Sequence, residues 1–320
     1  MLLYVLASDG SSPGRQGFFM AVNGAGETEG SIGGGIMEHK FVEMAKERLS
    51  TGDLVNKAAE TNHKALNISP GAGGTIKKQF HNKSAPANQS GMICSGEQTI
   101  LLYTASATDA EKVQQIITSL EQEQNGTLQF SPAGLQFFPA VPETDYFFTM
   151  TTEQDWIYQE KTGYKNHLHI VGAGHCSLAF SRMMKDMGFY IHLYDDRSAL
   201  KTFQENDFVH DKKILAQYED LHDLIPAGNN QYIVVMTMGY RTDDIVIRTL
   251  WNRSFRYMGV LGSKSKIEKL FNDYQAAGLP TGQLQKIHAP IGLAIHSQTP
   301  EEIAISIAAE IIQVKNSPHL

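Results

Sequence analysis

Short apolar stretches and helical patterns alternate through the second half of the chain, and this alternation is the strongest constraint on its fold. Each stretch is short enough to be one buried strand. Strands that alternate with helices form a parallel sheet with helices on both faces. We therefore expect a doubly wound α/β domain, with strands at Leu168–Val171, Tyr190–Tyr194, Lys213–Ala216, Tyr232–Thr237 and Tyr257–Leu261.

The first of these strands runs into the sequence Gly-Ala-Gly-His-Cys-Ser, which begins at Gly172. This is nearly the G-x-G-x-x-G pattern of dinucleotide-binding turns, with Ser in the third glycine position. In that pattern Gly172 permits the tight turn, and Gly174 lets a pyrophosphate approach the backbone. The amides of the helix that starts at His175 would hold the anion. The alternative is a turn that has only a structural role.

Asp195 lies at the end of the second predicted strand, 23 residues after Gly172. An acidic side chain at this place accepts hydrogen bonds from the ribose hydroxyls of a dinucleotide. Together with the glycine turn, it indicates a Rossmann-like domain that can bind a nucleotide-like ligand.

Two further segments are expected in the same crevice, because the carboxyl ends of parallel strands share one edge of the sheet. One segment follows the fourth predicted strand and carries Arg241. The other follows the fifth and carries Ser263, Lys264 and Lys266. Cations at a helix N-terminus are disfavoured by the helix dipole, and a bound anion would offset that cost. A solvated basic turn is the alternative.

The first half is rich in Gly and Ser and has weaker strand signals. From it we expect a smaller N-terminal α/β domain over residues 1–150, a linker over 151–166, and the Rossmann-like domain over 167–320. The interval 139–165 shows no regular period, and residues 82–91 resemble a loop. Helices are predicted at about 36–49, stopping at Gly52, and at 110–120; strands are predicted at Leu2–Ala7, Phe18–Val22, Thr28–Ile32, Thr75–His81 and Glu97–Tyr103.

A second glycine-rich turn joins a strand to a helix in this half. Gly33, Gly34 and Gly35 stand in a row, so no side chain shields their amides. Such a turn can cradle a phosphate, or it can simply satisfy a strained backbone. Arg15, in an earlier polar loop, would add positive charge to the first kind of site.

Cys94 stands among small neighbours just before a predicted strand, and as a thiolate it could ligate a soft metal or carry sulfur. A lone cysteine is also a common apolar filler, which is the interpretation we favour for Cys176. The 12 histidines show no recognisable metal-binding spacing, and no His–carboxylate pair is evident in the order expected of a dehydrogenase.

Composition narrows the function classes. Lys and Arg number 27 and Asp and Glu 34, a net charge of −7, which argues against a nucleic-acid binder and against an anionic membrane surface. No apolar run is long enough to span a bilayer. Two cysteines exclude a disulfide scaffold and indicate the reducing cytoplasm.

Taken in order, the motifs resemble the XdhC/CoxI family, the xanthine dehydrogenase accessory proteins. The resemblance covers nearly the whole chain, and its specificity comes from eight motifs in the right order. They are Gly10–Pro13, Gly30–Gly35, the Cys94 segment, Gly172–His175, Asp195–Arg197, Gly259–Lys264, His288–Leu293 and Thr299–Ala304.

The resemblance implies a cytoplasmic, self-associating protein, expected to be a homodimer, that binds the molybdenum cofactor and hands it to a molybdenum hydroxylase of the xanthine dehydrogenase type. It implies that Cys94 contacts the metal centre. The terminal phosphate of molybdopterin would occupy one of the two glycine turns, either Gly33–Gly35 or Gly172–Gly174. No catalytic residue is implied.

Two other functions remain open from the residues. One is an NAD(P)-dependent oxidoreductase that uses Gly172, Gly174 and Asp195 for its dinucleotide. The other is sulfur transfer, in which Cys94 carries a persulfide supplied by a cysteine desulfurase.

Overall fold

The computed structural model describes residues 1–61, 74–80 and 96–317, and for 52–61, 80 and 281 it describes the backbone alone. The chain divides into two compact units, Met1–Gly163 and Tyr164–Leu320. The expected loop at 82–91 and Cys94 lie outside the described residues.

The first unit contains a five-stranded antiparallel sheet in the order β3-β2-β1-β5-β4. Each of these strands overlaps a stretch that the sequence predicts as a strand. Their bounds are β1 (Leu2–Asp9), β2 (Phe19–Val22), β3 (Thr28–Gly30), β4 (Thr75–Phe80) and β5 (Glu97–Tyr103).

A second antiparallel sheet packs on the first, in the order β7-β6-β9-β8. Alternation along β1 explains the layers, since successive side chains of a strand point to opposite faces. Leu3 and Val5 pack with helix α1, whereas Tyr4 and Leu6 pack with the second sheet. The remaining elements are α1 (Gly35–Thr61), η1 (Ala107–Asp109), α2 (Ala110–Glu121), β6 (Gly126–Ser131), β7 (Gly134–Phe138), β8 (Tyr146–Thr152) and β9 (Asp155–Thr162).

Two expectations for this half are wrong. Helix α1 continues through Gly52 to Thr61, because one glycine costs a helix only about 1 kcal/mol. The interval 139–165 holds strands β8 and β9, so residues 151–166 are largely sheet and not a linker. No side chain of β8 is fully buried, and in β9 only Trp156 and Tyr158 are, which weakens the apolar period that would reveal a strand.

The second unit is built on a parallel five-stranded sheet in the order β12-β11-β10-β13-β14. This confirms the predicted doubly wound fold, because the order reverses direction at β10. The strands are β10 (Asn166–Val171), β11 (Phe189–Asp195), β12 (Asp211–Ile214), β13 (Gly228–Val235) and β14 (Phe255–Val260).

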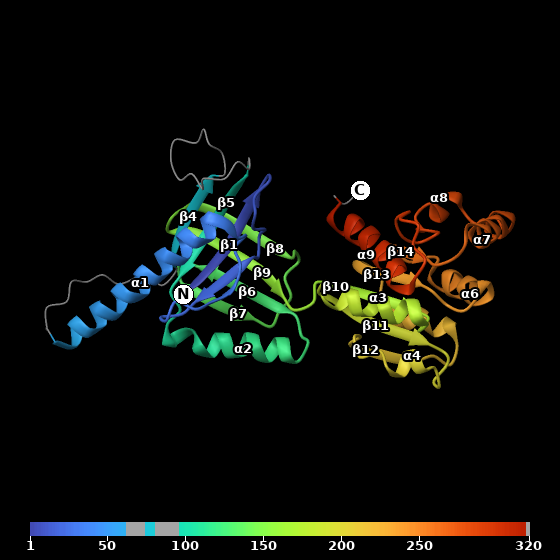
Figure 1. Ribbon diagram of the computed structural model, residues 1–320, viewed down its shortest axis with the longest axis horizontal. Helices are drawn as coiled ribbons and strands as arrows, with labels where there is room; N and C mark the ends of the chain where they lie inside the picture. The colour runs from blue at the N-terminus through green and yellow to red at the C-terminus, as the bar shows by residue number, and fades with distance from the viewer. Residues whose placement is uncertain (62–73, 81–95, 318–320) are drawn as a thin grey trace. The chain divides into compact units, whose positions relative to one another are not determined.

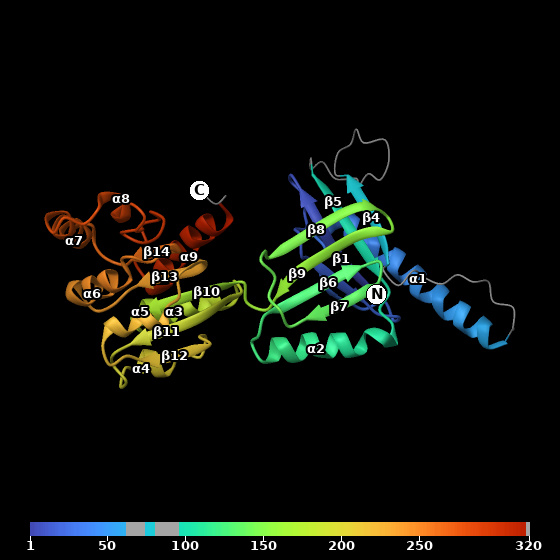
Figure 2. The same ribbon diagram turned by 180° about the vertical axis from the view of Figure 1, so that it is seen from behind.

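Helices cover both faces of this sheet (Figure 1, and from behind in Figure 2). One face packs against α3 (His175–Lys185), α4 (Lys201–Gln204) and α9 (Pro300–Asn316). The other packs against η2 (Tyr218–Asp220), α5 (Leu221–Leu224), α6 (Tyr240–Leu250), α7 (Lys264–Ala276) and α8 (Thr281–Leu284). Among the described residues, no helix combines the length and the apolar character that a membrane span requires.

Candidate functional site

Three helices of the second unit begin at the carboxyl edge of the parallel sheet. Each follows the end of a strand: α3 follows β10, α6 follows β13, and α7 follows β14. No side chain caps the first turn of α3 or α6, whose cap positions are Gly174 and Gly239. Backbone N–H groups at such helix starts favour an anion. This edge is the first candidate site.

The turn after β10 has the geometry expected of its glycines. Gly172 has φ +106°, and a Cβ there would lie 2.4 Å from the carbonyl oxygen of Met236, so only glycine fits. At Gly174 and Gly239 the space that a Cβ would fill is open. A ligand can therefore approach the backbone at both helix starts.

Asp195 does not have the expected role of a ribose acceptor. Its side chain is fully buried, and both oxygens already accept hydrogen bonds. Oδ2 accepts from the amide of Ala173 (2.7 Å) and from Nη2 of Arg197 (2.8 Å). Oδ1 accepts from Nε of Arg197 (2.8 Å) and from its amide (2.9 Å). Burial alone would raise the pKa of Asp195, but these hydrogen bonds outweigh it and lower the pKa.

The predicted polar residues of this edge lie at the helix starts. His175, Arg241 and Lys264 are exposed in the first turns of α3, α6 and α7, and Ser263 caps α7 by accepting from the amide of Lys266 (3.3 Å). The side chain of Lys266 is not available to a ligand, because its ammonium group contacts the buried carboxylate of Asp243.

The polar loop at Ser11–Gly14, the glycine-rich turn at Ile32–Gly35 and the start of β5 at Gly96–Gln98 lie next to one another. Gly14 packs against the carbonyl of Ile32, since a Cβ at Gly14 would lie 2.0 Å from that oxygen. The side-chain amide of Gln98 donates to the carbonyls of both residues (2.9 and 3.3 Å). Gly96, two residues after Cys94, packs against Asp9 and the Ser11–Ser12 backbone. This loop cluster is the second candidate site.

Glu38 already occupies the glycine turn in this loop cluster. Its Oε2 accepts from the hydroxyl of Ser31 (2.7 Å) and from the amides of Ile32 (2.9 Å) and Gly34 (3.0 Å). Burial would raise the pKa of Glu38, but these donors, with the amide of Gly33, lower it. A carboxylate of the chain thus takes the position expected for a phosphate at Gly33–Gly35.

Neither cysteine gives a described metal site. Cys94 lies outside the described residues, within which no group of three His, Cys, Asp or Glu side chains could hold a metal. Cys176 is a free, half-buried thiol in α3. Burial, followed by the charge of Glu301, raises its pKa, so Cys176 stays protonated at neutral pH.

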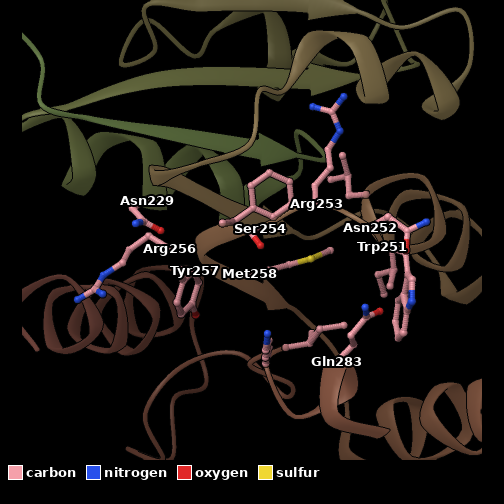
Figure 3. A pocket seen from close by; sticks show the side chains of 14 residues that line it. Asn229, Trp251, Asn252, Arg253, Ser254, Arg256, Tyr257, Met258 and Gln283 are labelled. Carbon is pink, nitrogen blue, oxygen red and sulfur yellow. The ribbon is translucent and has the colours of Figure 1, made fainter. Parts of the chain in front are cut away.

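A cavity of about 490 Å³ opens at the opposite, amino edge of the same sheet (Figure 3). Ser254, Met258 and Gln283 lie around it, whereas Arg253 and Arg256 donate to backbone carbonyls of Ile225 and Val314. None of the residues predicted as binding residues lines this cavity.

A His–carboxylate pair that the sequence did not reveal joins α9 to the segment beside β14. His288 Nδ1 lies 3.3 Å from Glu310 Oε1, and Oε2 accepts from Tyr257 (2.5 Å) and the amide of Gly292 (2.9 Å). Glu310 thus ties α9 to Tyr257 of β14 and to the segment that contains His288 and Gly292. His288 and Glu310 are 22 residues apart in the sequence, and only the fold brings them together.

Two family models match the chain. The XdhC Rossmann domain matches residues 168–311, and the XdhC and CoxI family matches residues 1–56. The uncharacterized protein YqeB of Escherichia coli (strain K12) is 28% identical over 159 residues, and a probable xanthine dehydrogenase subunit of Bacillus subtilis (strain 168) is 29% identical over 154 residues. These matches cover 48% and 47% of this chain but only 28% and 43% of the relatives.

One solved structure resembles the whole chain. A crystal structure of a xanthine dehydrogenase from Bacillus halodurans superposes with a TM-score of 0.69, covering 99% of this chain and 92% of that one. The sequence identity is 20%, so the likeness shows a shared fold.

Proposed function

The chain belongs to the XdhC and CoxI family, and from this premise we propose that it is an accessory protein of a molybdenum hydroxylase of the xanthine dehydrogenase type. In this role it binds the molybdenum cofactor and delivers it to the apo-enzyme. The Bacillus subtilis relative, whose name is that of a xanthine dehydrogenase component, supports the choice of client.

The observation that carries the proposal is the open, positively charged carboxyl edge of the second unit. Gly174 and Gly239 leave the amides of two helix starts uncapped. Arg241 and Lys264 are exposed beside them. Molybdopterin ends in a phosphate, which is the kind of group that such amides and cations bind. The phosphate is therefore proposed at Gly172–Gly174.

The other glycine turn is a poorer place for the phosphate. Because the carboxylate of Glu38 already accepts from the amides of Ile32 and Gly34, a phosphate there would meet a like charge. Contact between Cys94 and molybdenum remains a proposal. It rests on the family resemblance, because Cys94 lies outside the described residues.

Anaerobic equilibrium dialysis against isolated molybdenum cofactor, with metal and pterin analysis, tests the proposal. Arg241→Gln/Lys264→Gln is expected to weaken binding about a hundred-fold, because it removes two charge-assisted contacts that contribute about 1.5 kcal/mol each. Arg182→Gln/Lys185→Gln is the matched control, since it removes the same charge from exposed positions in the last turn of α3. Cys94→Ser is expected to weaken retention of the metal.

Two outcomes would contradict the proposal. If wild type retains no cofactor, the carrier function is wrong. If both double variants lose affinity equally, the loss comes from the lower positive charge of the protein as a whole and not from a site at the carboxyl edge. A homodimer and a cysteine desulfurase partner are further parts of the proposal, measured by light scattering and by co-purification with added desulfurase.

An NAD(P)-dependent oxidoreductase is the second candidate function. The tight turn at Gly172 and the open backbone at Gly174 favour a dinucleotide. The saturated carboxylate of Asp195 argues against one whose ribose needs an acidic acceptor.

A further inference from the structure

We infer that the carboxyl edge of the second unit selects its ligand by a phosphomonoester held by Arg197, and not by a ribose diol held by Asp195. The inference rests on the proposed function for its location. It adds the ligand chemistry and assigns the residue that recognises it.

A diol has no acceptor at Asp195. A carboxylate offers about four lone-pair positions, and four donors already use them: two amides and two N–H groups of Arg197. The side chain has no exposed surface. A ribose hydroxyl would have to displace a charge-assisted hydrogen bond and reach a buried group, and both are unfavourable.

Arg197 still has donors to offer. A guanidinium carries five N–H groups. Nε and Nη2 each donate once to Asp195, and Nη1 donates once to the sulfur of Met238 at 3.3 Å. One N–H on each terminal nitrogen therefore has no partner among the described residues. The side chain is 34% exposed, so a ligand can reach these groups.

The surroundings suit a doubly charged phosphate. Asp195 fixes the guanidinium in one orientation, so little conformational freedom is lost when a ligand binds. Met238, whose thioether is a weak acceptor, is 82% exposed and can move aside. The carboxylate of Asp196 lies 3.8 Å from Nε, but it accepts from the hydroxyl of Tyr218 (3.0 Å) and does not contact the terminal nitrogens.

Two sources of this chemistry can be distinguished. Molybdopterin ends in a phosphomonoester, and NADP+ carries one on its ribose, whereas NAD+ has a free diol at that position. Comparing each phosphorylated ligand with its dephosphorylated partner isolates the contribution of the phosphate. The probes are NADP+ with NAD+, and molybdenum cofactor with phosphatase-treated cofactor.

Calorimetry or anaerobic dialysis on wild-type protein is expected to show at least ten-fold tighter binding of the phosphorylated member of whichever pair binds. Arg197→Lys keeps the positive charge but removes the planar guanidinium with its paired N–H donors. It should reduce the preference for the phosphorylated ligand several-fold. Arg182→Gln, which removes a guanidinium at the far end of α3, should leave it unchanged. Thermal melts identify variants that fail to fold, and the wild-type comparison stands without them.

The outcomes separate the two proposals. Equal affinity for both members of a pair would overturn the inference, and if the molybdenum cofactor binds equally with and without phosphate, the carrier function survives. A phosphate preference for NADP+ without any cofactor binding supports the inference and contradicts the carrier function. If no probe binds at millimolar concentration, both are wrong.

Discussion

Glu38 places a negative charge inside the turn that precedes α1, and this charge should decide whether a free anion can enter. Donors from Ser31, Ile32 and Gly34 converge on one oxygen of its carboxylate. A bound sulfate or phosphate would need the same donors. The chain thus supplies its own anion for this turn.

Replacing Glu38 by Gln should therefore open the turn to anions. The substitution removes the charge and should lower the melting temperature by a few degrees, because about 1 kcal/mol of charge-assisted hydrogen bonding is lost. Added sulfate should restore much of that loss in Glu38→Gln and have less effect on wild type. Differential scanning calorimetry in sulfate and in chloride at equal ionic strength measures this.

Glu47→Gln is the control for this experiment, since Glu47 is exposed on the same helix. An identical response to sulfate in wild type and Glu38→Gln would show that Glu38 does not occupy an anion site.

Residue identity alone could locate the glycine turns but not the partners of their amides. Asp195 stands where an acidic residue accepts ribose hydroxyls, and only the fold shows that Arg197, two residues later, saturates it. Glu38 looks like an ordinary first-turn acidic residue of a helix. In both cases backbone curvature, which the sequence does not encode locally, brings donors to the carboxylate.

Strands β10 and β11 carry a ladder of stacked imidazoles. The rings of His169 and His192 lie 4.5 Å apart and nearly parallel, and His167 Nδ1 lies 3.2 Å from His192 Nε2. His169 is buried between the hydroxyl of Tyr194 (3.1 Å) and the side-chain amide of Gln231 (2.8 Å). Burial, followed by the neighbouring imidazole of His192, lowers the pKa of His169 to about 3.

This ladder should make the second unit sensitive to acid. Unfolded, His169 binds a proton near pH 6.5; folded, it does so only near pH 3. Between these two pH values the unfolded state binds more protons than the folded state. The contribution of His169 to the free energy of unfolding is therefore fully present above pH 6.5 and is lost as the pH falls toward 3. The loss is about 1.4 kcal/mol per pH unit for one such group. His192, whose pKa is also lowered by burial, should add to the slope.

Urea unfolding of Trp156→Phe protein between pH 7 and 5, followed by the fluorescence of Trp251, measures this slope in the second unit. When His169→Gln is added, the decrease in the free energy of unfolding between pH 7 and pH 5 should become smaller by about 2 kcal/mol. His222→Gln is the control, because His222 is 60% exposed. Equal slopes with and without His169 would show that the ladder does not bind protons as described.

Elements with a strong apolar period were predictable, and those without it were not. All five parallel strands of the second unit overlap predicted stretches, because most of these strands are buried against neighbours. Strands β6 to β9 were missed. Buried positions do not alternate regularly with exposed ones in β6 and β7, and β8 has no fully buried side chain, so the two-residue period of a strand is weak.

The molecule consists of two units whose described hydrophobic cores do not mix. Two clusters belong to Met1–Gly163 and two to Tyr164–Leu320. The sequence predicted two domains from the change in composition, but it placed a linker at 151–166, where β9 completes the second antiparallel sheet. Sheet pairing across the chain, which sets this boundary, leaves no local signal.

Residues 164–320 alone should therefore fold cooperatively. A unit of this size buries enough apolar surface to be stable, and its sheet has both faces covered from within. Circular dichroism should show one sharp thermal transition, with a midpoint within a few degrees of that reported by Trp251 in the full chain. A broad transition, or binding of a hydrophobic dye by the isolated unit, would show that it depends on the rest of the chain.

The central strand β10 has a consequence for synthesis on the ribosome. Both of its neighbours, β11 and β13, are translated after it, and α9, which buries Leu168 and Ile170 from one side, comes later still. The part of the apolar surface of β10 that α9 covers therefore stays exposed until α9 has been translated, whereas the first unit is by then complete. The emerging second unit is the part of the polypeptide that should most need a chaperone during its production.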